Sequence, residues 1–358
     1  MNSDYMQRII DEDAVGQLRR RDGRMAALGS EDGVPKLDWV EGIARLLADD
    51  FRLEAVEAEA RDILKRGIRH IIWAGMGGSV MAVRVLTELG FCGRDKSGPY
   101  EHDQVVIYPL DSTDPAALNA IVRRVAHAKN LSLPEVGAIN IAPTVGAAWL
   151  RALLDDVMMI GVSMGMTSEE PITHLEWFTD LLGQAELSPA EHLLVMTLPG
   201  SYLDRFAHEH AVPTRSLQLD GGTGTGGRMS APTTRVFLLP AALYLARLTD
   251  QPGRLRAMLQ QAWDWYDLDG AAEHPAEHPF VQLAAALSEA SFDGICRLLL
   301  EMPPEWSAMM QWIEQLMEES LGKGGKGVVV FNEQPLDASQ PGYTCLLYTS
   351  PSPRDRQK

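Results

Sequence analysis

The segment HIIWAGMGGSVMAV, residues 70–83, places a short apolar run directly before a turn of small residues. The turn contains Gly75, Gly77, Gly78 and Ser79, and an amphipathic run over 80–89 follows it at once. This order predicts a strand, a tight turn and a helix. Glycine has no Cβ, so the main chain at such a turn can approach a ligand closely. A plain strand–helix turn explains the same residues, so the segment alone leaves both interpretations open.

The pattern of the first segment repeats along the chain. Four further apolar runs follow, at 104–110, 156–163, 192–198 and 215–219, and helix-like segments separate them, including 114–128 and 168–185. Asp114 followed by Pro115 is typical of a helix start. Strands that alternate with helices indicate a parallel sheet covered on both faces. We therefore predict an α/β fold over 36–232, a three-layer αβα doubly wound parallel sheet, after an N-terminal arm at 1–35.

The second half of the chain has a different pattern. From residue 233 most segments are helical, and only ICRLLLEM (295–302) and GVVVFN (327–332) have the composition of strands. We predict an incomplete second α/β domain over 233–344. The final segment, CLLYTSPSPRDRQK (345–358), changes character abruptly and resembles the translation of a common transposon sequencing adapter. We expect it to be non-native and exclude it from the fold.

Charge and composition exclude several classes of function. The formal net charge is −17, whereas nucleic acids and anionic membrane surfaces require a basic face. The three cysteines are far apart and form no CxxC pair, so no disulfide framework or zinc site is indicated. No apolar run reaches transmembrane length, and the N-terminus is too charged for a signal peptide. We expect a cytoplasmic protein without a metal or a cofactor.

A second ligand-binding motif is GVSMGMTSEEP, residues 161–171. A predicted strand ends there in Ser163, Gly165, Thr167 and Ser168, and a helix with acidic residues in its first turn follows. Hydroxyl groups and free backbone N–H groups at a helix start form an uncharged phosphate cradle. A simple capping motif has the same residues, since helix starts favour Ser or Thr followed by acids.

A third motif, LDGGTGTGGRMSAPTT (219–234), matches GxGxxG through Gly222, Gly224 and Gly227. It lacks the following helix and the acidic residue that a dinucleotide site needs. The more informative part is Gly227 followed by Arg228. A guanidinium on a glycine turn can stabilise a developing oxyanion or bind a phosphate. An exposed surface arginine is the alternative.

The fourth motif is QWIEQLMEESLGKGGKG, residues 311–327. Glu318 and Glu319 lie near the end of an apolar helix, where acidic side chains oppose the helix dipole. Adjacent helical residues point about 100° apart, so the two do not form a carboxylate pair. One of them is a candidate for a single general base.

Together, the four motifs in this order resemble the phosphoglucose isomerase family, which is built from sugar-isomerase (SIS) domains. The likeness is greatest to the isomerase portion of bacterial transaldolase–isomerase fusions. The family patterns Gly-x-Gly-Gly-Ser, Ser-Lys-x-x-Thr-Thr-x-Glu, Gly-Gly-Arg and Glu-Ser-x-Gly-Lys match the segments 75–79, 163–170, 226–228 and 319–323. The resemblance covers about residues 36–344.

The resemblance implies an isomerase that interconverts glucose 6-phosphate and fructose 6-phosphate, as a homodimer when full length. It implies roles for the matching residues. The 6-phosphate would be held by Ser163, Thr167 and Ser168, in the loop that also contains Gly165. The sugar would be contacted by Gly77, Gly78 and Ser79. The enediolate would be stabilised by Arg228 with the Gly227 backbone, and Glu319 would carry the proton between C2 and C1.

Two departures from the family pattern affect this prediction. Met164 occupies the position of the phosphate-loop lysine, so one charged contact is missing. The ring-opening histidine and a late lysine of the family have no counterpart in this chain, and we hypothesise that it binds cyclic sugar but turns it over poorly. The alternatives are a non-catalytic SIS module that binds sugar phosphates, and an isomerase for another phosphosugar such as mannose 6-phosphate. A dinucleotide enzyme fits least well.

Overall fold

The computed structural model describes residues 4–31, 33–89, 105–133, 146–219, 232–248, 251–293, 297–320, 327–332 and 346–349. The chain divides into two compact units. Within the described ranges, the first unit takes residues 46–219 and 232–258, and the second takes 4–45 and the residues from 259 onward. Each unit is described by itself.

A five-stranded parallel sheet forms the centre of the first unit. Its strands, in spatial order, are β4 (Val106–Leu110), β3 (His70–Ala74), β5 (Val157–Val162), β6 (Leu193–Met196) and β7 (Thr214–Arg215). Four of the five predicted strands are confirmed. The fifth, predicted at 215–219, is largely wrong: β7 shares only Arg215 with it, and beyond β7 Gln218 pairs with Thr234 in an isolated antiparallel bridge.

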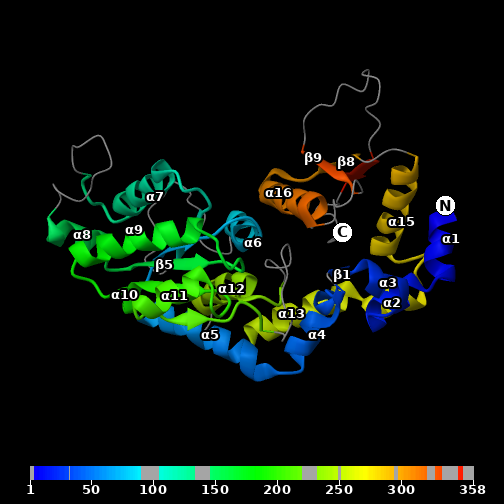
Figure 1. Cartoon of the computed structure of the whole chain (residues 1–358), viewed down its shortest axis with the longest axis horizontal. Coiled ribbons are helices and arrows are strands. Elements are labelled where there is room, and N and C mark those ends of the chain that lie inside the picture. Colours follow the sequence, from blue (N-terminus) through cyan, green and yellow to red (C-terminus); the bar gives the residue numbers. More distant parts are fainter. Residues whose placement is uncertain are drawn as a thin grey trace, which may run out of the picture. The chain divides into compact units, whose positions relative to one another are not determined.

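Helices cover both faces of this sheet (Figure 1). One face is covered by α7 (Pro115–Ala128), α8 (Ala147–Leu154), α9 (Glu170–Gln184) and α11 (Tyr202–Glu209). On the other side, α6 (Gly78–Glu88) contacts β3 and β4, and α12 (Arg235–Leu248) packs on α6 and on α5 (Asp50–Lys65). The short helix α10 (Pro189–His192) precedes β6. The predicted three-layer αβα doubly wound fold is confirmed. Helix α12, which follows the predicted domain boundary at residue 233, packs within this unit.

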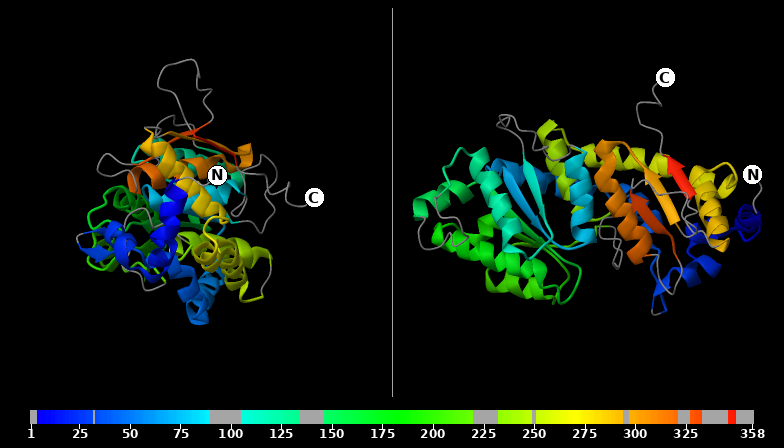
Figure 2. Two further views of the ribbon diagram at one scale, coloured as in Figure 1. Left: turned by 90° about the vertical axis from the view of Figure 1, so that its right-hand side faces the viewer. Right: turned by 90° about the horizontal axis from the view of Figure 1, so that it is seen from above.

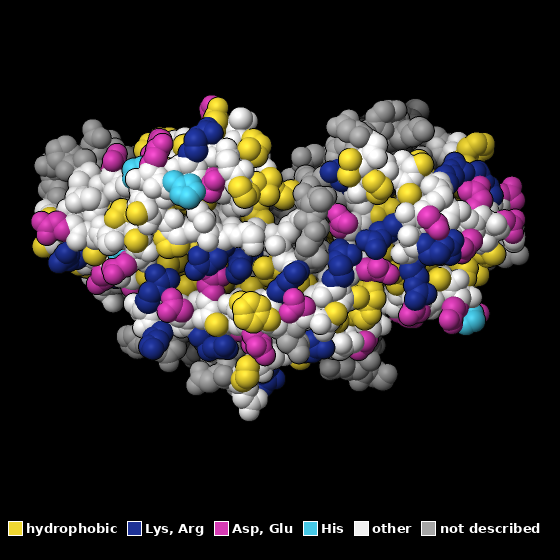
Figure 3. Space-filling view, turned by 60° about the horizontal axis from the view of Figure 1, so that its bottom comes forward, with side chains coloured by type: hydrophobic (Ala, Val, Ile, Leu, Met, Phe, Trp, Pro, Cys, Tyr) yellow, Lys and Arg dark blue, Asp and Glu magenta, His cyan; other side chains and the backbone are white. Residues whose placement is uncertain are grey.

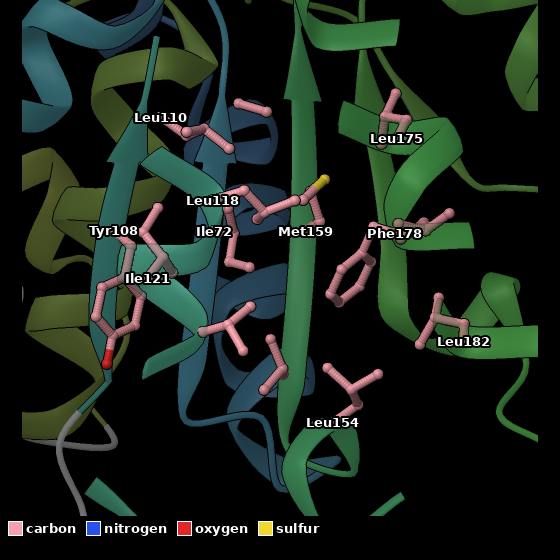
Figure 4. Close-up of a cluster of buried hydrophobic side chains, with 14 of the residues drawn as sticks. Ile72, Tyr108, Leu110, Leu118, Ile121, Leu154, Met159, Leu175, Phe178 and Leu182 are labelled. Carbon is pink, nitrogen blue, oxygen red and sulfur yellow. The ribbon is translucent and has the colours of Figure 1, made fainter. Parts of the chain in front are cut away.

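A close-packed apolar cluster joins the sheet to α7, α8 and α9 (Figure 4). Ile72, Tyr108 and Met159 enter it from three neighbouring strands and are at most 1% exposed. The helices supply Leu118, Ile121, Leu154, Leu175, Phe178 and Leu182. Burial of each large apolar side chain is worth about 1.5–3 kcal/mol relative to exposure. The cluster therefore fixes the strands whose ends carry the predicted motifs.

The second unit contains a three-stranded parallel sheet in the order β10 (Leu346–Thr349), β8 (Arg297–Glu301), β9 (Val329–Asn332). Figure 2 shows it in orange and red beside the orange helix α16 (Ser307–Gln315). The strands predicted at 295–302 and 327–332 are confirmed as β8 and β9. Strand β10 lies within the terminal segment 345–358, for which we expect a non-native origin.

The N-terminal arm forms short elements of the second unit. They are α1 (Asp4–Asp11), α2 (Ala14–Arg20), α3 (Gly23–Leu28), β1 (Ser30–Glu31) and β2 (Val34–Pro35), and the 3-10 turn η1 (Asp38–Glu41) follows them. Met6 of α1 packs against Val281 and Ala285 of α15 (Pro279–Phe292). The unit also includes α14 (Leu268–Glu273) and the 3-10 turn η3 (Pro304–Trp306). The unit boundaries fall inside α4 (Gly42–Leu47) and α13 (Arg254–Tyr266).

Candidate active site

The order of the strands brings two predicted motifs to one edge of the sheet. Strands β3 and β5 are neighbours in the sheet, and Ala74 at the end of β3 pairs with Gly161 in β5. From β3 the chain crosses to β4 on one side, whereas from β5 it continues to β6 and β7 on the other side. Ligands of doubly wound folds bind at such a switch point, beyond the carboxyl ends of the strands. The loops at 75–79 and 163–168 flank this point.

The glycine turn after β3 is shaped by Ser79. The Ser79 hydroxyl accepts a hydrogen bond from the Met76 backbone N–H at 2.8 Å and donates one to the Met76 carbonyl at 2.7 Å. The side chain is buried, and Gly77 has φ 51° and ψ −125°, a conformation suited to glycine. Among the described residues, the backbone N–H groups of Gly77 and Gly78 have no protein acceptor. Thus the side chain of Ser79 fixes the turn, and the backbone N–H groups of Gly77 and Gly78 are available to donate to a ligand.

Residues 163–168, which follow β5 and are called the hydroxyl loop below, are held in place by Ser163. The backbone N–H of Ser163 donates to the Met196 carbonyl in β6 at 3.1 Å. Its hydroxyl accepts from the Gly165 N–H at 3.0 Å and donates to Ser168 Oγ at 2.6 Å. Ser163 is buried, whereas Thr167 is exposed and its hydroxyl has no partner in the described part of the chain. The structure therefore brings Ser163 and Ser168 together, and leaves Thr167 facing solvent.

The helix ends at this edge differ in how they are capped. Helix α7 is capped by Asp114, which accepts from the Ala116 N–H at 2.9 Å, and α11 is capped by Ser201, which accepts from the Asp204 N–H at 3.1 Å. Helices α6 and α9, which flank the switch point, have no side-chain cap. Their first N–H groups, with the positive end of each helix dipole, suit an anionic ligand. The alternative that residues 163–170 are a simple capping motif is thus not supported by the hydrogen bonds.

The fourth motif lies in the second unit, in a π-helical turn, η4 (Leu316–Ser320), that follows α16. Such turns are frequent at functional sites. Glu318 accepts a hydrogen bond from the Val330 N–H of β9 at 2.9 Å, so its carboxylate has a structural contact. The backbone of Glu319 belongs to η4, but its side chain lies outside the described atoms, as do Gly227 and Arg228. The roles predicted for these three residues stay predictions.

His174, which sequence reasoning missed, joins α9 to the loop after β4. The residue is 1% exposed, and its Nε2 lies 2.8 Å from the Ser112 carbonyl oxygen. A carbonyl only accepts, so Nε2 carries the proton. Its Nδ1 is buried without a partner in the described residues. Burial lowers the pKa of His174, and the Ser112 contact opposes this shift. The imidazole thus holds the loop after β4 against α9. The sequence gave no signal of this contact, because His174 is a single histidine on an apolar helix face.

The described ranges contain neither a metal site nor a helix that could span a membrane. They contain no group of three or more His, Cys, Asp or Glu residues arranged to hold a metal ion. None of their helices combines the length and the apolar character needed to cross a membrane.

Comparison with solved structures supports the fold. No family model matches the sequence, and no curated protein is similar enough to it to match. The structure resembles that of a hypothetical protein from Thermus thermophilus, with a TM-score of 0.60 and 21% identity over 98% of this chain and 67% of that one. It also resembles a glucose-6-phosphate isomerase from Chlamydia trachomatis, with a TM-score of 0.59 and 16% identity over 92% of this chain and 60% of that one. Both likenesses support the α/β fold with a doubly wound parallel sheet.

At these identities the likeness shows the fold alone. The chain spans 67% and 60% of the length of the two solved proteins. The strand order of this fold accounts for the position of the glycine turn and the hydroxyl loop on either side of the switch point. The activity must be argued from the residues of the site.

Proposed function

We propose that this chain binds a phosphorylated hexose beyond the carboxyl ends of β3 and β5, and interconverts glucose 6-phosphate and fructose 6-phosphate. The observation that carries the proposal is the pair of loops at 75–79 and 163–168. They flank the switch point and lead into the N-termini of α6 and α9, which have no side-chain cap. The structural similarity to a glucose-6-phosphate isomerase supports it. A homodimeric assembly and a cytoplasmic location belong to the same proposal.

The phosphate group binds at the hydroxyl loop. The Ser163–Ser168 hydrogen bond fixes the backbone there, and the Thr167 hydroxyl is free to donate. Hydrogen bonds to a charged acceptor contribute about 1.5–3 kcal/mol each. The sugar binds near Gly77 and Gly78, whose N–H groups face no protein acceptor in the described residues. Ser79 contributes by holding this turn.

Isomerisation requires a base and a cation. Glu319 removes the proton from C2 of the open-chain aldose, the electron pair forms the C1–C2 double bond, and the negative charge moves to the carbonyl oxygen. Arg228, with the Gly227 backbone, stabilises that oxyanion. A proton then moves from the oxygen on C2 to the oxygen on C1. Glu319 returns its proton to C1, so that C1 carries the hydroxyl and C2 the carbonyl of the ketose. A positioned base of this kind contributes about 10²–10⁴-fold to the rate.

The adjacent glutamates provide the test. We expect Glu319→Gln to abolish exchange of the C2 proton of glucose 6-phosphate in D₂O, measured by NMR, and to leave binding intact. The matched control is Glu318→Gln, in which the amide oxygen can still accept from the Val330 N–H, so exchange should continue at the wild-type rate. Equal exchange rates in Glu319→Gln and the wild type would contradict the proposal. Binding without exchange in the wild type would favour the non-catalytic SIS module.

A further inference from the structure

The turn between β6 and α11 lies beside the hydroxyl loop, residues 163–168. The Tyr202 backbone N–H donates to the Met166 carbonyl at 3.0 Å. Together with the bond from Ser163 to Met196, this bond places the first turn of α11 beside residues 163–168.

Arg205 lies on that first turn, and its guanidinium points back toward Gly200, at the start of the turn. The guanidinium carbon is 4.6 Å from the centre of the Tyr202 ring, and Nη1 donates to the Gly200 carbonyl at 3.3 Å. This direction is the usual one, because long side chains on a helix point toward its N-terminus. Arg205 is exposed, and no carboxylate within the described residues pairs with it. It therefore keeps donors free for a ligand.

The hydroxyl loop needs a cation for an anionic ligand. Residues 163–168 contain no basic side chain, and Met164 is apolar. Glu169 and Glu170 follow directly, and Asp204 accepts from the Gly200 N–H at 2.7 Å. A phosphate dianion bound at this loop would be disfavoured by the negative charge of Glu169 and Glu170, which follow the loop directly. An arginine at the rim of the loop would offset them.

We propose that Arg205 binds the phosphate group of the substrate, and supplies at the hydroxyl loop the positive charge that the loop itself lacks. The inference rests on the proposed function. The guanidinium exchanges its bond to the Gly200 carbonyl for charge-assisted bonds to phosphate oxygens, which are stronger and can be bidentate. The cation–π contact with Tyr202 holds the stem near this position in the free protein.

The test compares two arginines of the full chain. Arg205→Gln and Arg123→Gln remove the same charge, but Arg123 is exposed in the middle of α7 and makes no side-chain hydrogen bond or ion pair within the described structure. We expect Arg205→Gln to weaken binding of glucose 6-phosphate about 10- to 100-fold, measured by calorimetry. Arg123→Gln should match the wild type, and Arg205→Lys should recover part of the affinity. Inhibition of binding by inorganic phosphate should weaken in parallel, and the salt dependence of binding should become shallower.

The outcomes separate the inference from the proposed function. Wild-type binding of glucose 6-phosphate with equal affinity in Arg205→Gln and Arg123→Gln overturns the role of Arg205 and leaves the proposed function standing. Absence of wild-type binding to any phosphorylated hexose overturns the proposed function, and the inference with it. An equal loss of affinity for phosphate and for unphosphorylated glucose would also contradict the inference, since it would indicate a change in the fold of the loop.

Discussion

Gly75 shows how little space separates the glycine turn from the end of β5. A Cβ atom at this position would collide with the Ser79 hydroxyl oxygen and lie 3.1 Å from the Val162 carbonyl oxygen. The hydroxyl cannot move away without breaking its two bonds to Met76, and the carbonyl belongs to the backbone of a central strand. The turn thus tolerates no side chain at residue 75.

We predict that Gly75→Ala destabilises the protein by about 1–3 kcal/mol, as overpacking of a filled site does. It should also weaken sugar binding, because the turn that carries Gly77 must shift. The control is Gly183→Ala on α9, where a Cβ meets nothing within 4 Å and alanine favours the helix by about 0.5–1 kcal/mol. Urea denaturation measures both changes. A stability equal to that of the wild type in Gly75→Ala would show that the turn is looser than described.

Single residues also show what sequence patterns can and cannot give. The cap at Asp114 was predictable, because an N-cap acts on backbone only two residues away. The Glu318 contact with Val330 was not, since it joins residues from η4 and β9 whose proximity depends on how the chain folds back. The same holds for Arg205, whose position beside residues 163–168 follows from the packing of two neighbouring turns.

At the scale of elements, apolar runs predicted where the strands lie but not how they are ordered. Strands β3, β4, β5 and β6 are short apolar runs, whereas the order β4-β3-β5 depends on which faces the crossing helices cover. That order creates the switch point. The short length of β7 could not be predicted from the sequence either, because it depends on the bridge between Gln218 and Thr234, which are far apart in the chain.

Helix α9 should respond to charge differently at its two ends. Thr167, just before the helix, is exposed and has no partner in the described residues, so Thr167→Glu should change stability by no more than about 0.5 kcal/mol. The new carboxylate should weaken binding of glucose 6-phosphate about tenfold or more, because it replaces a donor by a like charge. The control, Gln184→Glu, adds the same charge at the far end of α9, well beyond a Debye length of about 8 Å. Calorimetric binding constants that agree for the two variants would argue against a phosphate site at this helix end.

Across the whole molecule, the acidic balance does not conflict with an anionic ligand. On the face drawn in Figure 3, basic and acidic side chains of the described residues are interspersed, although the net charge of the chain is −17. The overall charge slows the approach of an anion. Local donors decide whether it binds, as at Gly77, Gly78 and Thr167.

The proposed reaction uses residues of both units. In the proposed reaction, loops of the first unit bind the phosphate and sugar groups, and the proposed base, Glu319, belongs to η4 of the second unit. A ligand that binds only the folded state slows local opening wherever it makes contacts. We predict that glucose 6-phosphate slows amide hydrogen exchange in residues 75–79, 163–168 and 316–320 together.

Inorganic phosphate provides the control for this exchange measurement, because it carries the charge without the carbon atoms on which the base acts. It should protect residues 163–168 and leave 316–320 unchanged. Protection by glucose 6-phosphate confined to the first unit would remove Glu319 from the site, and would favour a module that binds sugar phosphates without isomerising them. Protection of residues 316–320 by glucose 6-phosphate, but not by inorganic phosphate, would support Glu319 as the base of the proposed reaction.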